Sequence, residues 1–192
     1  MKPSKNGNIL LVLTSLPRYF YCHYSVPVAG QFLSYLDDQI EFCDQLEKST
    51  KLHLKLRLDP TSRERDWDIK GFLDLANYSK NIITSRVSIW SQIKKSRLCV
   101  CTSNSTVFLE TLSRNFPTLI FWDPTYNEIS VEAEPFIEQL VAAEILFFCP
   151  SAAAKKVNNI SKNVNDWWFS EKVQRARKNF CKQFAFTAND WT

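Results

Sequence analysis

Short apolar runs alternate with longer amphipathic segments along the 192-residue chain. Apolar runs of four to eight residues are typical of buried strands, and an apolar face that recurs every three to four residues is typical of a helix. Strands are predicted at 9–13, 52–58, 81–84, 98–101, 118–122 and 145–149. Helices are predicted at 30–48, 69–78, 88–95, 107–114, 131–143, 150–165 and 168–186.

This alternation predicts an α/β fold with a doubly wound, mostly parallel six-stranded Rossmann-like sheet and helices on both faces. Residues 1–192 contain no repeat or linker, so we expect a single domain. The strict alternation of apolar and polar residues in 52–58 favours a strand near the sheet edge. In the usual strand order 3-2-1-4-5-6, ligands bind at the carboxyl ends of the strands, where the order reverses between the first and fourth strands.

Four loops are expected at that edge of the sheet, and one of them is unusually polar. The loops are 14–24, 57–59, 102–106 and 122–128. Residues 102–106 read Thr-Ser-Asn-Ser-Thr and precede a predicted helix, whose first N–H groups favour an anion such as phosphate. The alternative is that Ser103 or Ser105 only caps the helix. Five consecutive polar residues, including Asn104 and Thr106, favour a ligand loop.

Four further side chains are candidates for the same site. Arg57 and Arg18 lie at predicted strand ends and carry the planar fork that suits phosphate, although each could instead form a surface salt bridge. Glu110 lies one helical turn after Thr106, where a carboxylate could accept two ribose hydroxyls or simply face solvent. Asp123 ends an apolar run, so it could bind sugar hydroxyls or cap the next turn.

Catalytic residues are less evident than binding residues. His23 is the one histidine at the predicted site edge and is a candidate general base, or else a structural residue of an aromatic loop. The chain has three glycines and contains no GxGxxG, GxxxxGK[ST] or GxSxG motif. This excludes a Rossmann dinucleotide loop, a Walker A loop and a nucleophile elbow.

The cysteines do not suggest a metal site. None of the six has CxxC spacing, and the chain has two histidines, so no metal is predicted. We expect reduced, buried thiols in a cytoplasmic protein, with Cys99 and Cys101 on one face of a strand. We expect no signal peptide, and the sequence contains no apolar run of about 20 residues.

Charge is distributed unevenly along the chain. The net charge of +4 is too mild to indicate nucleic acid. Residues 123–144 contain six acids and no lysine or arginine, whereas residues 155–182 contain eight bases. These segments are either two solvated helical surfaces, or the basic stretch makes peripheral contact with an anionic membrane or a polyanionic substrate.

Several motifs carry a family resemblance over nearly the whole chain. The run from Thr102 to Glu110, Pro117 and the strand ending Trp122-Asp123-Pro124 resemble the C-terminal, donor-binding half of GT-B glycosyltransferases. Other runs resemble the LIC12162-type family of bacterial transferases linked to surface polysaccharide; they are Ser15 to Tyr19, Ser25 to Gln31, Asp166 to Trp168, and Val173 to Cys181. The resemblance implies a nucleotide-sugar as co-substrate, no further cofactor, diphosphate at the helix start and ribose at Glu110.

Two departures from the GT-B pattern shape the expectation. Val107 occupies the place of the usual threonine, three residues before Glu110. GT-B enzymes also use two Rossmann-like domains, so we expect a missing or separate N-terminal half that binds the acceptor. The alternatives are a non-catalytic binding or regulatory module, a half-enzyme, or a transferase that uses a CDP-alcohol donor.

Overall fold

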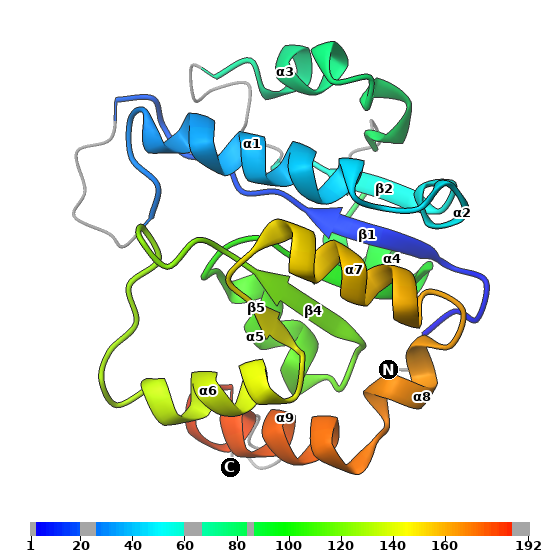
Figure 1. The fold of residues 1–192 in the computed structure, drawn as a ribbon, viewed down its shortest axis with the longest axis vertical. Coiled ribbons are helices and arrows are strands. Elements are labelled where there is room, and N and C mark those ends of the chain that lie inside the picture. The colour runs from blue at the N-terminus through cyan, green and yellow to red at the C-terminus, as the bar shows by residue number, and fades with distance from the viewer. Residues whose placement is uncertain (1–2, 20–25, 60–66, 84–86, 186–192) are drawn as a thin grey trace.

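A parallel sheet forms the centre of the computed structural model, which describes residues 3–19, 26–59, 67–83 and 87–185. The sheet has five strands in the order β2-β1-β3-β4-β5, and each neighbouring pair is parallel (Figure 1). The strands are β1 (Asn8–Val12), β2 (Leu54–Arg57), β3 (Ser96–Cys101), β4 (Thr118–Phe121) and β5 (Leu146–Phe147). The predicted α/β class with a parallel sheet is confirmed.

Helices connect the strands and continue after the last one. They are α1 (Gln31–Asp44), α2 (Lys48–Lys51), α3 (Ile69–Leu75), the 3-10 helix η2 (Ser79–Asn81), α4 (Ile89–Lys94), α5 (Thr106–Ser113), α6 (Glu134–Ala142), α7 (Pro150–Ile160), α8 (Val164–Trp168) and α9 (Glu171–Phe184). The helix predicted at 168–186 is therefore wrong at its start. The chain leaves helical geometry at Ser170, whose extended backbone (φ −62°, ψ 149°) separates α8 from α9.

The prediction of six strands is wrong for the part of the chain that the structure describes. At the predicted third strand, Ile82 makes one parallel bridge with Leu56, and the Ile83 amide donates to the Leu56 carbonyl at 2.9 Å. The preceding residues turn through η2, and the Asn81 side chain donates to the Leu54 carbonyl at 3.0 Å. The Asn81 side chain thus occupies the Leu54 carbonyl, which a longer third strand would pair with a backbone amide. The bridge still lies beside β2, where the expected order places the third strand.

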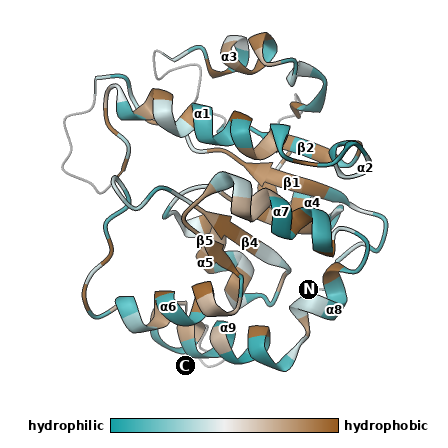
Figure 2. Cartoon of the chain, in the orientation of Figure 1, coloured by the Kyte–Doolittle hydropathy of each residue, from teal (hydrophilic) through white to brown (hydrophobic). Residues whose placement is uncertain are grey.

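Alternate strand residues point into two separate hydrophobic layers, because successive side chains of a strand face opposite sides. Leu11, Leu56 and Val100 pack in a layer with residues of α1, α3 and α7. Leu10 and Cys99 pack in the other layer with residues of α4, α5, α6 and α9. Figure 2 shows the hydrophobic strands at the centre and hydrophilic residues on the outer sides of the helices. The sheet is therefore doubly wound.

The described cysteines are free, and four of them, Cys43, Cys99, Cys101 and Cys181, are buried. Cys99 and Cys101 share a face as predicted, with their sulfur atoms 3.8 Å apart. Cys149 is exposed, which contradicts the expectation of uniformly buried thiols. It follows the two-residue edge strand β5 and stands at the N-cap position of α7, where its Sγ lies 3.0 Å from Ser151 Oγ.

Candidate functional site

A pocket of about 240 Å³ lies at the carboxyl ends of β1, β2 and β3. β1 and β3 are neighbours in the sheet, and the chain leaves them for α1 and α5, which pack in opposite layers. The pocket therefore occupies the point where the strand order reverses, the usual ligand position in such sheets. Its lining residues are Val12, Leu13, Thr14, Arg57, Leu58, Asp59, Ile89, Cys101, Thr102, Ser103, Ser105, Thr106 and Val107.

The polar loop that leads into α5 supplies four lining residues with hydroxyls, Thr102, Ser103, Ser105 and Thr106. Ser105 stands at the N-cap position with an extended backbone (φ −130°, ψ 167°), yet its side chain makes no cap hydrogen bond within the described chain. The loop is held instead by its backbone, because the Ser105 amide donates to the Ser103 carbonyl at 2.9 Å. The Ser103, Ser105 and Thr106 hydroxyls bond to none of the residues that the structure describes. The alternative that Ser103 or Ser105 caps the helix through its hydroxyl is therefore not observed.

Thr102, the first residue of the same loop, belongs to the scaffold. Its hydroxyl donates to the Val12 carbonyl at 2.8 Å and accepts from the Tyr35 hydroxyl, with the two oxygens 2.7 Å apart. The Tyr35 oxygen in turn accepts from the Thr14 amide at 2.8 Å. Burial raises the pKa of Tyr35 above its usual range, so the hydroxyl keeps its proton. This network fixes the end of β1 against the end of β3.

Sequence reasoning did not identify Tyr35 as part of this edge. It lies on α1, about twenty residues after Thr14, and is almost fully buried. A buried tyrosine usually needs a partner for its hydroxyl. A tyrosine on the apolar face of a predicted helix, in a chain with a hydroxyl-rich loop, was the available signal.

Arg57 ends β2 and, among the residues that the structure describes, is the one arginine that lines the pocket. Its Nη1 donates to Gln92 Oε1 at 2.7 Å and to the Val87 carbonyl at 3.2 Å. Partial burial lowers the pKa of Arg57, and the nearby Asp59 carboxylate raises it. An arginine nonetheless stays charged at neutral pH. Arg57 therefore brings a positive charge to the same pocket as the α5 N-terminus.

The other predicted site residues lie outside the pocket lining. Arg18 is exposed, and its guanidinium lies 5.2 Å from the centre of the Trp67 ring. Glu110 is exposed on α5. The side chain of Asn104 is also exposed. His23 lies outside the described residues.

The polar groups of Asp123 and Asn127, in the loop after β4, form hydrogen bonds with other residues of the protein. Asp123 Oδ1 accepts from the Thr125 amide at 2.8 Å, so this carboxylate caps its own turn. Asn127 Nδ2 donates to the Asp123 carbonyl at 3.0 Å, and Asn127 Oδ1 accepts from the Asn104 amide at 3.4 Å. Asn127 is buried and links the loop after β4 to the loop after β3. Its position in the predicted loop 122–128 was the only sequence signal for this role.

Tyr126 fastens the same loop to α1. Its hydroxyl donates to Asp38 Oδ2 at 3.0 Å. Burial raises the pKa of Asp38, the Tyr126 hydrogen bond lowers it, and the charges of Asp123, Glu41 and Asp37 add to the rise. The hydrogen bond between Tyr126 and Asp38 is therefore a structural contact that lies among other acidic side chains.

The groups around the pocket are suited to bind an anion. Within the described part of the chain, the charged lining residues are Arg57 and Asp59, and the other oxygen- and nitrogen-bearing groups of the lining are hydroxyls and backbone. Cys101 also lines the pocket, but the interaction with Cys99 and burial raise the pKa of its thiol well above the usual value. It therefore stays a neutral thiol and does not supply a thiolate nucleophile. Within the described residues, no group of three His, Cys, Asp or Glu side chains could hold a metal ion.

A larger hollow of about 480 Å³ lies between α6 and α9, away from the strand ends. Ala142, Ala143 and Ala176 leave space where the helices meet, and Lys172 and Arg175 stand among the lining residues. It contains none of the predicted site residues. Its position on two outer helices gives it no relation to the reversal point of the sheet.

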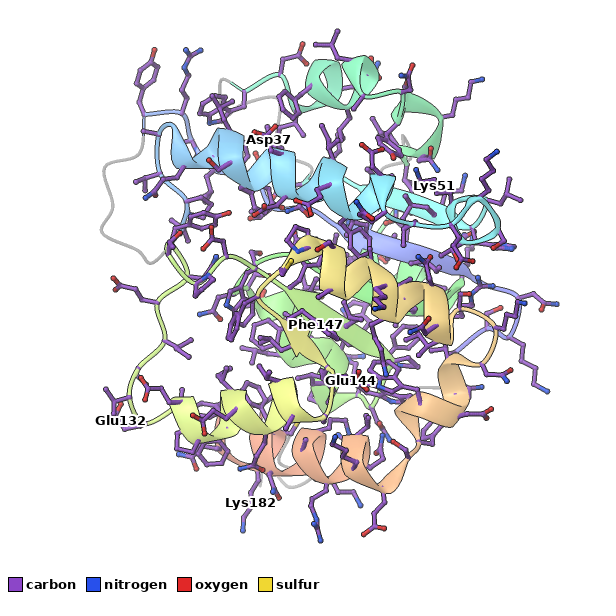
Figure 3. The ribbon with its side chains drawn as sticks, viewed as in Figure 1. Asp37, Lys51, Glu132, Glu144, Phe147 and Lys182 are labelled. Carbon is purple, nitrogen blue, oxygen red and sulfur yellow. The ribbon has the colours of Figure 1, made fainter. Side chains whose placement is uncertain are left out.

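The basic stretch 155–182 is not uniformly available to a partner. Lys156 pairs with Glu144 at 2.7 Å, and buried Arg177 donates to the Leu112 carbonyl at 3.0 Å. The other six bases, Lys155, Lys162, Lys172, Arg175, Lys178 and Lys182, are exposed. Figure 3 shows Lys182 on the outer side of α9. No helix in the described ranges combines the length and apolar character that crossing a bilayer requires.

Comparisons with known proteins identify the family of this chain. No curated protein matches the chain. One similar solved structure is that of WaaG, a glycosyltransferase involved in lipopolysaccharide biosynthesis, with 12% sequence identity and a TM-score of 0.46. The similarity covers 97% of this chain and 44% of WaaG, so the chain spans less than half of WaaG. The family model described as LIC12162 family transferase matches residues 1–192, and the chain therefore belongs to the LIC12162 family of transferases.

Proposed function

We propose that this chain is the donor-binding domain of a glycosyltransferase-like enzyme of GT-B type, and that its pocket holds the diphosphate of a nucleotide-sugar. The observation that carries the proposal is the convergence of Arg57, three hydroxyls without a described partner and the N-terminus of α5 in one pocket. Membership of a transferase family supports the reaction class.

Each of these groups complements a diphosphate physically. The first N–H groups of a helix carry partial positive charge and point at a bound anion. The hydroxyls of Ser105 and Thr106 can donate to phosphate oxygens, and the Arg57 guanidinium can donate twice. Charge that develops on the leaving nucleotide diphosphate would meet these fixed donors. The chemistry is therefore positioning of the donor and stabilisation of its leaving group.

Glu110 and Asp123 extend the proposed donor site beyond the pocket. Glu110 lies four residues after Thr106 on the same helix, an axial distance of about 6 Å, which suits a ribose attached to a diphosphate held at the helix start. The exposed carboxylate of Glu110 would accept the ribose hydroxyls. Asp123 already uses Oδ1 for its turn, so a sugar hydroxyl would bind its other oxygen. We assign Arg18 and Asn104 outer positions at most.

We further propose that a facing domain, separate or N-terminal, supplies the acceptor site. The pocket is a hollow at one edge of a sheet, and another surface would enclose the sugar. The resemblance to transferases of bacterial surface polysaccharide supports an acceptor of that class. The exposed bases between 155 and 182 would suit peripheral contact with an anionic membrane at which such an acceptor is held.

Calorimetry with UDP-, GDP-, CMP- and dTDP-sugars tests the function, with CDP-glycerol in parallel as a CDP-alcohol donor. We expect one nucleotide-sugar to bind with a millimolar or tighter Kd. Tighter binding of CDP-glycerol than of any nucleotide-sugar would identify the donor as a CDP-alcohol. The proposed diphosphate site would then still stand. A folded protein that binds none of these donors would contradict the proposal.

A further inference from the structure

Gln92 is a buried polar residue that none of the sequence motifs explains. It lies on α4 with 6% of its surface exposed, and its Oε1 accepts from Arg57 Nη1 at 2.7 Å. Its Nε2 is buried and has no partner among the described residues. Burial of the unpartnered Nε2 costs desolvation free energy, which offsets the stability gained from the hydrogen bond of Oε1. Its remaining contribution is the contact with Arg57.

The α4 segment holds Gln92 firmly in place. The Ser88 side chain caps the helix by accepting from the Ser91 amide at 3.2 Å. At the other end, the Ser96 hydroxyl donates to the Gln92 carbonyl at 2.9 Å and joins α4 to the first residue of β3. The Gln92 amide is thus presented from a helix fixed at both ends.

The described residues hold Arg57 through one of its three guanidinium nitrogens, Nη1. An Nη1 group has two N–H donors, and the two acceptors, Gln92 Oε1 and the Val87 carbonyl, account for both of them. Nε and Nη2 donate to none of the residues that the structure describes. Holding Nη1 fixes the guanidinium plane and leaves the other donors for a ligand. An arginine fixed in this way loses less entropy when an anion binds.

We propose that Gln92 is a positioning residue for anion binding and acts by fixing the Arg57 guanidinium in the pocket. This inference rests on the proposed function, because it takes the pocket as a diphosphate site. Gln92 itself does not line the pocket, so its effect on a ligand would be transmitted through Arg57. The proposal therefore predicts that the affinity of the pocket for an anion depends on Gln92, although Gln92 does not contact the anion.

Inorganic pyrophosphate is the probe, and Gln92→Met is the test variant because methionine keeps the length of the side chain and its helix propensity. Gln39→Met is the matched control. Gln39 is buried on α1, also has one unpartnered amide atom, and makes its hydrogen bond to the Tyr35 carbonyl. We expect Gln92→Met to weaken pyrophosphate binding about tenfold and Gln39→Met to leave it unchanged. Equal losses in both variants, or no loss in Gln92→Met, would overturn the proposal.

A ligand-free readout separates this inference from the proposed function. ¹⁵N NMR of the arginine side chains should show slow rotation of the Arg57 guanidinium in the wild type, assigned by its loss in Arg57→Lys. In Gln92→Met the rotation should become fast, whereas in Gln39→Met it should stay slow. Fast rotation already in the wild type would overturn the positioning role. Slow, Gln92-dependent rotation in a folded protein that does not bind pyrophosphate would support the role and refute the diphosphate site.

Discussion

The loops that follow β3 and β4 occupy equivalent places in the sheet but differ in how their polar groups are used. Both leave buried parallel strands at the same edge. In the loop after β4, the Asp123 carboxylate accepts from a backbone amide, the Tyr126 hydroxyl donates to Asp38, and the Asn127 side chain donates to the Asp123 carbonyl. In the loop after β3, the Ser103 and Ser105 hydroxyls bond to no described residue and line the pocket.

This difference separates a scaffold loop from a candidate binding loop. Buried and half-buried polar groups are normally paired, so paired groups stabilise the fold and unpaired groups at a pocket are available to a ligand. Residue type alone does not distinguish the two cases, because both loops are rich in short polar side chains. The comparison predicts that changes in the loop after β4 alter stability, whereas changes at the pocket alter ligand affinity.

Loss of Arg57 should have the largest effect on binding. Arg57→Met removes the positive charge that Arg57 brings to the pocket. A hydrogen bond to a charged group contributes about 1.5–3 kcal/mol, so pyrophosphate affinity should fall by about 10- to 100-fold. Calorimetry measures this change. Arg18→Met is the matched control, because Arg18 stacks on Trp67 outside the pocket lining and its loss should leave affinity unchanged. A larger loss in Arg18→Met than in Arg57→Met would reverse the assignment.

Loss of Asn127 should have the largest effect on stability. Asn127→Ala leaves the Asn104 amide and the Asp123 carbonyl without their side-chain partner, which should lower the free energy of unfolding by about 2 kcal/mol. Urea denaturation measures the difference. Asn104→Ala is the control, because it keeps the Asn104 backbone amide that donates to Asn127 and removes only an exposed side chain. Its free energy of unfolding should change by less than about 0.5 kcal/mol. Equal stability of the two variants would remove the structural role of Asn127.

Loss of the Ser105 hydroxyl should affect affinity but hardly stability. Ser105→Ala removes a proposed phosphate donor worth about 1 kcal/mol, which corresponds to a roughly fivefold weaker Kd for pyrophosphate. Because Ser105 makes no cap bond, thermal unfolding should change little. Asp68→Ala provides the contrast, since the Asp68 cap of α3 accepts from the Gly71 amide at 2.9 Å and its loss should cost about 1 kcal/mol of stability. A stability loss in Ser105→Ala without loss of affinity would identify Ser105 as a structural cap.

Loss of the Tyr126 hydroxyl should have the smallest and most pH-dependent effect. The hydroxyl bonds the charged form of Asp38 and lowers a pKa that burial raises, so Tyr126→Phe should raise the pKa of Asp38 further. A raised folded-state pKa gives stability that is present below the unfolded value of about 3.9 and is lost as pH rises through the folded value. The variant should therefore be about 1 kcal/mol or less destabilised at pH 7, and the difference should shrink towards pH 3. A difference that grows on acidification would contradict this ionisation state.

Much of the fold could be predicted because apolar periodicity records burial directly. The alternation in 52–58 indicated an edge position, and among the described residues β2 is flanked on its outer side by the single bridge to Ile82. The third strand was predicted from the apolar residues of 81–84. In the structure the Asn81 side chain donates to the Leu54 carbonyl, a contact that apolar periodicity does not reveal. Exposure of Cys149 was also missed, since it depends on β5 being a short edge strand.

The candidate site was predictable only in part. Residue types and the helix start selected Ser103, Ser105, Thr106 and Arg57, and the structure places all four around one pocket. The contacts of Gln92 and Asn127 depend on distances between residues far apart in the chain, which periodicity does not encode. The roles of Glu110 and Asp123 in donor binding stay predictions.

A ¹H–¹⁵N NMR titration of the wild-type protein with inorganic pyrophosphate tests the central claim most directly, because it locates the ligand. The account predicts saturable shifts of the amides of residues 105–108 and of Arg57, with smaller shifts for residues 123–127. A response centred on 123–127 or on the hollow between α6 and α9, or no response in a folded protein, would contradict a diphosphate site at the start of α5.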